Sequence, residues 1–202
     1  IVTMTHASCQ WTSTMTVAPS KGVAFTACHT WGKAALTELL ALKPDVVVFS
    51  DHPDRGIVSD KKSDPHSRTV IGRGMAPYLE KLIDNGAQVV GIEESPRPYI
   101  DIPDCLAGRH GSIASCTVAH SKAVYTHTPV EAAIAKLKAD PKYADSARRV
   151  NLNPLICGPT QCRPIVGDVI VYRDADHLTN TYSLTLKPYL EKALLTVKTL
   201  AG

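Results

Sequence analysis

The residues best suited to chemistry are an acid and an imidazole near the end of the chain, Asp174 and His177. They lie in the segment "VGDVIVYRDADHLTNTYS" (166–183), directly after a run of β-forming residues. A carboxylate three residues before a histidine can accept its Nδ1–H, fix the tautomer and leave Nε2 free as a general base. The spacing therefore predicts a catalytic histidine with an orienting acid.

A second interpretation of this segment is structural. Chance yields an Asp-x-x-His spacing about once in every two chains of this composition. Acidic residues before a helix also commonly cap it, which would leave His177 simply exposed. Asp176 adjoins His177 and is expected to face solvent or to cap the last helix. The local sequence leaves both interpretations open.

Apolar runs alternate with helical patterns along the chain, and these elements must position the acid and the imidazole. This order predicts an α/β fold, a three-layer α/β/α sandwich with a mainly parallel sheet. In such a sheet residues 50–52, 93–95 and 174–177 should converge at the carboxyl ends of the strands. Strands are expected at 1–5, 45–50, 87–94, 150–156 and 166–173, and helices at 29–43, 75–86, 128–140, 141–149 and within 179–200; 51–69 is expected to be a polar loop and 95–118 a surface excursion.

Composition narrows the class of protein. A length of 202 residues with 44% hydrophobic and 20% charged residues suits one globular domain, 1–202. The net charge of +3 comes without any basic run interleaved with aromatics, so a nucleic-acid partner is not expected. No apolar stretch is long enough to cross a membrane.

Six cysteines fall into three couples close in sequence: Cys9 and Cys28, Cys105 and Cys116, Cys157 and Cys162. An even count in loops rich in proline and glycine favours disulfides and an oxidising compartment, although the connectivity stays open. Reduced thiols in a cytosolic protein are the alternative. A metal site is less favoured, because there is no Cys-x-x-Cys and the "DHPD" segment (51–54) with His66 has no fixed ligand spacing.

Four segments carry a family resemblance: "ICGPTQCRPIVGDVIVYRDADHLTNTYSLTLKPYL", "HASCQW", "TACHTWGKAALTELLALKPDVVVFS" and "GAQVVGIEESPRPYIDIPDC". Together they resemble the SGNH-type (GDSL-like) domain of actinobacterial membrane acyltransferase-3 family O-acyltransferases. In that family a cysteine pair precedes a strand that ends in an Arg-Asp-x-x-His-Leu-Thr/Ser box. The resemblance covers most of the chain and implies an SGNH-hydrolase-like fold with flavodoxin-like strand order.

The resemblance also implies a function. Such a domain lies on the extracytoplasmic side, periplasmic or cell-wall, tethered to the membrane by a preceding domain. It receives an acyl group, typically acetyl, from an acyltransferase-3 membrane domain and passes it to a cell-envelope carbohydrate, with no cofactor. Asp174 and His177 would be two members of a Ser-His-Asp triad. Arg173 would orient the acyl group or an anionic acceptor, ahead of Arg97, whereas Glu93 and Glu94 are expected to be solvated.

The third member of the triad is not visible. The family serine stands in a Gly-Asp-Ser box after the first strand, but the only Gly-Asp here is Gly167-Asp168, followed by Val169. Because the resemblance begins at the family's second strand, we expect the first strand and helix to precede this sequence. Ser50 and Ser8 are candidate substrate-binding residues, each expected to be a loop hydroxyl. The alternatives are a carbohydrate O-acyl esterase with the same triad and a non-catalytic glycan-binding or scaffolding domain.

Overall fold

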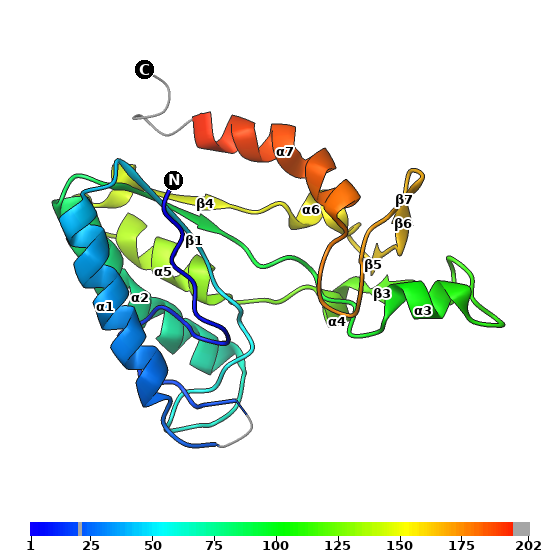
Figure 1. The fold of residues 1–202 in the computed structure, drawn as a ribbon, viewed down its shortest axis with the longest axis horizontal. Helices are drawn as coiled ribbons and strands as arrows, with labels where there is room; N and C mark the ends of the chain where they lie inside the picture. Colours follow the sequence, from blue (N-terminus) through cyan, green and yellow to red (C-terminus); the bar gives the residue numbers. More distant parts are fainter. Residues whose placement is uncertain (20–21, 196–202) are drawn as a thin grey trace. The chain divides into compact units, whose positions relative to one another are not determined.

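The computed structural model describes residues 1–19 and 22–195. The chain divides into two compact units, each described by itself (Figure 1). Among the described residues, unit 1 comprises 1–93 and 126–150, and unit 2 comprises 94–125 and 151–195. The prediction that residues 1–202 form one SGNH-like domain stays a prediction.

Unit 1 contains a parallel sheet of three strands, β1 (Val46–Ser50), β2 (Gln88–Ile92) and β4 (Ala147–Val150). Their order is β1-β2-β4, and Figure 1 shows the three side by side. The run of valines in β1 and β2 is typical of strands inside parallel sheets. The α/β class with a parallel sheet is therefore confirmed.

The α-helices of unit 1 are α1 (Thr26–Leu42), α2 (Pro65–Asp84) and α5 (Pro129–Lys138), and the last two begin at side-chain caps. Asp64 caps α2 by accepting the Ser67 N–H at 2.7 Å, and Thr128 caps α5 in the same way. The helices α2 and α5 pack so closely that a Cβ at Gly72 would overlap the carbonyl of Pro129. Together with the sheet, these two helices enclose a hydrophobic core. The core includes Val47, Phe49, Ile71, Leu79, Val89, Val130, Leu137 and Ala147.

Unit 2 is built from shorter elements. The strand β3 (Val118–Ala119) pairs antiparallel with β5 (Gln161–Cys162), and β6 (Ile165–Val166) pairs antiparallel with β7 (Val169–Ile170). The helices are α3 (Ile102–Ala107), α4 (His120–Ala123), α6 (Asn153–Ile156) and α7 (Asn180–Leu195). A second core forms here from Ile102, Cys116, Ile156, Val171, Tyr172, Tyr182 and Leu186.

Several sequence-based element predictions are wrong. Residues 1–5 are coil, because β-forming residues make a strand only with a partner strand. The expected strand at 166–173 is instead the β6–β7 hairpin, since Gly167 adopts a φ of 58° and reverses the chain. The strand expected at 150–156 lies instead at Ala147–Val150 and takes the end of the segment 141–149, for which the sequence predicts a helix. The short helix α6 follows this strand.

Helix limits also differ from the expected ones. The helix α2 begins at Pro65, ten residues before the expected start, because Asp64 caps it and proline is well tolerated in a first turn. It therefore includes part of the segment expected to be a polar loop. The closing helix α7 covers Asn180–Leu195, and the remainder of the expected helix lies outside the described residues.

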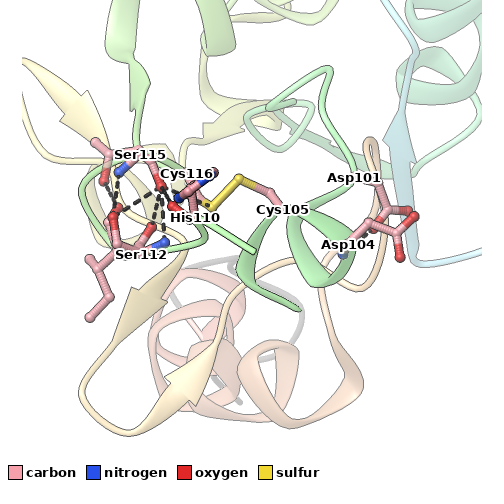
Figure 2. The surroundings of a disulfide bond; sticks show 9 residues. Asp101, Asp104, Cys105, His110, Ser112, Ser115 and Cys116 are labelled. Atoms are coloured by element: carbon pink, nitrogen blue, oxygen red, sulfur yellow. Dashed lines mark hydrogen bonds between the residues drawn. A yellow bond between two sulfur atoms is a disulfide. The ribbon is translucent and has the colours of Figure 1, made fainter. Parts of the chain in front are cut away.

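The six cysteines pair as the three local couples: Cys9–Cys28, Cys105–Cys116 and Cys157–Cys162. Figure 2 shows the second of these, which joins α3 to the end of the loop that carries Ser112 and Ser115. Asp101 caps the same helix by accepting the Asp104 N–H at 2.9 Å. The cross-link therefore anchors an exposed loop to the core of unit 2.

Replacing both Cys105 and Cys116 with alanine should lower the free energy of unfolding by about 3 kcal/mol, because the bond restricts the unfolded chain. Urea unfolding of the oxidised protein, followed by circular dichroism, measures the change. The matched control is the Cys157→Ala, Cys162→Ala pair, whose separation of 5 residues instead of 11 predicts a smaller loss.

Non-reducing mass spectrometry should find all three bonds, and reduced thiols throughout would contradict an oxidising compartment.

Candidate active site

The loop that follows β7 is folded around one carboxylate. Asp174 Oδ1 accepts the backbone N–H groups of Asp176 and His177, both at 2.7 Å. The Arg173 N–H donates to the His177 carbonyl at 2.9 Å and closes the loop. Aspartate commonly organises a turn in this way, by bonding to the backbone just after itself. The loop geometry thus follows from local sequence.

The same loop brings the predicted acid and imidazole together. His177 Nδ1 lies 2.9 Å from Oδ2 of Asp174 and 3.0 Å from Oδ1. In the tautomer that carries its proton on Nδ1, the ring donates to the carboxylate and leaves Nε2 as an acceptor. The His177 side chain is 60% exposed, so Nε2 is accessible to a reacting group. The catalytic role of the pair stays a prediction.

The electrostatics of this loop keep Asp174 ionised. Desolvation raises its pKa, but the N–H groups of Asp176 and His177 and the His177 ring outweigh it, so the pKa falls from 3.8 to about 2. Asp174 is therefore an anion at every pH at which a histidine could act as a base. Such an anion stabilises the imidazolium that forms when the ring takes up a proton.

Arg173 extends from the same loop toward the same carboxylate. Its Nε lies 3.4 Å from Asp174 Oδ2, and its side chain is 63% exposed. An exposed ion pair of this kind contributes little to stability. Orientation of a substrate by Arg173 stays a prediction.

The two candidate serines belong to unit 1. Ser50 is the last residue of β1, and Ser8 lies in an exposed turn with a φ of 62°. Among the described residues, no hydrogen bond joins either hydroxyl to a histidine or a carboxylate. Because the serines lie in unit 1 and His177 in unit 2, the expected convergence of these groups stays a prediction.

Asp176 does not cap the last helix, and its side chain is 39% exposed to solvent. Asp176 Oδ1 lies 3.2 Å from Arg97 Nη2 in an ion pair, whereas Thr179 caps α7 by accepting the Tyr182 N–H. Arg97, ranked behind Arg173 as a group that could orient a substrate, has a side chain only 11% exposed, and its guanidinium lies over the ring of Tyr99. No spacing in the sequence indicates this pair, because its members are far apart along the chain.

The two acids after β2 also differ from the expectation of solvated side chains. Glu93 is buried, and its carboxylate lies 2.5 Å from both Arg149 Nε and Thr128 Oγ1. Burial raises the pKa of Glu94, and nearby Arg97 and His177 only partly offset it. Glu93 is thus a structural group of unit 1, and Glu94 belongs to the surroundings of the loop in unit 2.

A cavity of about 860 Å³ opens between α2 and α5. Its lining includes Arg73, His127, Glu131 and Lys136, and none of the predicted site residues. In the part of the chain that the structure describes, acids, histidines and cysteines form no group of three that could hold a metal.

Together, the parallel α/β sheet and an Asp-x-x-His loop before the closing helix define an SGNH-hydrolase-like protein. Residues 1–192 match the family described as the SGNH domain (fused to AT3 domains), and the chain belongs to this family. No curated protein matches the chain.

A solved structure shows a similar fold, the lipopolysaccharide acetyltransferase periplasmic domain of Salmonella ser. Paratyphi A. The TM-score is 0.54 at 14% identity, and the match covers 84% of this chain and 64% of that chain. This chain therefore spans less than two thirds of that structure. Three disulfides are typical of extracytoplasmic proteins. Within the described residues, no helix combines the length and apolarity needed to span a membrane.

Proposed function

We propose that this chain is an extracytoplasmic O-acyltransferase domain, most simply an O-acetyltransferase. It moves an acyl group through an acyl-serine to a hydroxyl of a cell-envelope glycan or glycolipid. The observation that supports the proposal is the contact between His177 Nδ1 and Asp174 Oδ2 at 2.9 Å, on a ring that is 60% exposed. The chain belongs to a family of SGNH domains that are fused to AT3 domains. This agrees with a membrane-bound acyltransferase partner that delivers the acyl donor and tethers the domain.

The proposed mechanism has two symmetrical halves. His177 Nε2 takes the proton of a serine hydroxyl as its oxygen attacks the acyl carbonyl, and the proton passes to the leaving group when the tetrahedral intermediate collapses. In the second half His177 deprotonates the acceptor hydroxyl, which attacks the acyl-serine, and the proton returns to the serine. Asp174 holds Nδ1–H and stabilises the imidazolium in both halves. This route uses no metal or diffusible cofactor.

The proposal assigns the nucleophile to no serine among residues 1–202, because the family's Gly-Asp-Ser box does not occur there. Arg173, next to Asp174, is proposed to orient the acyl group or an anionic acceptor.

Two other functions have some support. The exposure of His177 would also admit water, which favours a carbohydrate O-acyl esterase with the same residues. The lack of a Gly-Asp-Ser box favours a non-catalytic glycan-binding domain.

Fluorophosphonate labelling of the complete natural protein separates these functions, because the probe reacts with an activated serine. We expect one labelled serine, and a rate of labelling that falls strongly in His177→Ala. Transfer of the acyl group to a glycan rather than to water then distinguishes the transferase from the esterase. An unlabelled protein that still binds glycan would contradict both enzymes and support the binding domain.

A further inference from the structure

A second segment of unit 2 holds the Asp174–His177 loop at two adjacent residues. The Arg97 guanidinium pairs with the carboxylate of Asp176 at 3.2 Å. The Tyr99 N–H donates to the carbonyl of Ala175 at 3.1 Å. Both contacts come from the three residues Arg97–Tyr99, and both reach the loop between the predicted acid and the predicted base. The loop is therefore fixed from outside as well as by its own hydrogen bonds.

The Arg97 side chain is itself held firmly. It is only 11% exposed, lies 5.9 Å from the centre of the Tyr99 ring and hydrogen-bonds to Tyr125. Tyr99 and Tyr125 share a hydrogen bond between their hydroxyls. The backbone N–H of Arg97 donates to the carbonyl of Ala123 at 2.8 Å. This network ties the arginine to the segment that ends α4.

The backbone of the same segment is restricted. Pro96 and Pro98 flank Arg97 and limit the conformations of the residues before them. Tyr99 adopts a φ of 58°, which is unusual for an aromatic residue and persists only where the surroundings impose it. A restricted segment of this kind suits the positioning of another loop.

The hydrogen bonds within the loop and its contacts with Arg97 and Tyr99 constrain different positions. Asp174 fixes the position of His177 relative to itself, but it does not fix the loop relative to the rest of unit 2. The two external contacts supply that second constraint. Misplacement of a catalytic group by about 1 Å can reduce a rate about 100-fold, so this constraint matters for acyl transfer.

We propose that Arg97, through Asp176, is a positioning residue that holds the Asp174–His177 loop in its productive place, assisted by the backbone of Tyr99. The inference rests on the proposed function for its effect on catalysis. Its structural part, the restraint of the loop, can be measured without any reaction.

The charges around the loop make the proposal testable in a second way. The charged and titratable groups of the loop and of the side chains that contact it or Arg97 are Glu94, Arg97, Tyr99, Tyr125, Arg173, Asp174, Asp176 and His177. Removal of the Arg97 charge leaves this set more negative and favours the protonated imidazole, which cannot act as a base. Removal of the Asp176 charge has the opposite effect.

The first experiment compares Arg97→Met, Asp176→Asn and the double variant in the complete protein. Each single change should lower kcat by roughly 10-fold to 100-fold with KM nearly constant, because positioning rather than binding is lost. The double variant should be no slower than the slower single variant, since both changes break one contact. Arg97→Lys should recover part of the rate. Exposed Arg163, in the same unit, supplies the control Arg163→Met, which should match the wild type.

The pH profile separates positioning from a general loss of structure. The acid limb of kcat should move to higher pH in Arg97→Met and to lower pH in Asp176→Asn, and it should return toward the wild type in the double variant. The proposal would be overturned if the acid limbs of the two single variants moved in the same direction. It would also be overturned if the losses of kcat were fully additive in the double variant, or if kcat were unchanged in Arg97→Met.

Amide hydrogen exchange of the loop tests the restraint itself. The amides of Asp176 and His177 should exchange faster in Arg97→Met and Asp176→Asn, and at the wild-type rate in Arg163→Met. Unchanged exchange would refute the restraint whatever the activity. Faster exchange in a protein whose His177→Ala variant still transfers acyl groups would support the restraint and refute the proposed function, so the two failures are distinguishable.

Discussion

His177→Ala is expected to reduce acyl transfer by the complete protein by a factor of about 10⁴ or more, because it removes the group that carries the proton in both halves of the reaction. Stability should change little, since the His177 side chain is 60% exposed and its ring contacts the exposed loop carboxylate of Asp174. The measurements are the rate of transfer to a glycan acceptor and the midpoint of thermal unfolding.

The matched control for this change is His110→Ala. His110 is an exposed histidine of the same unit, in the loop beside the Cys105–Cys116 disulfide (Figure 2). The His110→Ala variant should transfer acyl groups at the wild-type rate. A loss of rate in His177→Ala then depends on the position of that imidazole and not on the number of histidines. A normal rate in His177→Ala would remove the basis of the proposed mechanism.

Local signals explain the parts of the fold that the sequence predicts well. The unbroken apolar residues of β1 and β2 predict buried parallel strands, and both strands lie within one or two residues of the expected limits. Asn85 and Gly86 predict the end of α2, where Gly86 adopts a φ of 102°. Thr128 predicts the start of α5 and accepts the Glu131 N–H there. Each of these signals depends on residues that are neighbours in the chain.

Elements that depend on distant partners are predicted poorly. The apolar residues of "IVTMT" could form a strand, but strand formation requires a neighbour that the local sequence does not specify. The run after Val166 has the composition of a long strand, yet Gly167 and Asp168 form a two-residue turn within it. In that segment the turn outweighs the β propensity of the residues on either side.

The candidate site divides in the same way. The contact between Asp174 and His177 is predictable because it closes within one loop. The ion pair between Arg97 and Asp176 is not, because it joins segments brought together only by the folding of unit 2. The spacing thus predicts which groups meet, and the tertiary structure alone reveals what holds them in place.

Asp174→Asn should slow acyl transfer by roughly 10³-fold to 10⁴-fold while it keeps the loop folded. Asp174 Oδ1 accepts the two backbone N–H groups and lies 3.0 Å from His177 Nδ1, whereas Oδ2 lies 2.9 Å from the same nitrogen. The carbonyl oxygen of asparagine can replace Oδ1 in the turn, which places an amide N–H₂ donor opposite Nδ1. This donor favours the tautomer in which Nδ1 accepts and Nε2 carries the proton, and that tautomer cannot act as a base at Nε2.

The comparison with Asp176→Asn decides which acid orients the imidazole. Asp176→Asn leaves the Asp174–His177 contact intact and should lose only the smaller factor expected from a loosened loop. Hydrogen exchange should show a faster loop in Asp176→Asn and a nearly normal loop in Asp174→Asn. Because the pKa of Asp174 is lowered to about 2, its negative charge is complete above its ordinary value of 3.8 and is lost only as the pH falls through about 2. The wild type should therefore show no loss of rate from Asp174 near neutral pH, and a larger defect in Asp176→Asn than in Asp174→Asn would assign the orienting role to Asp176 instead.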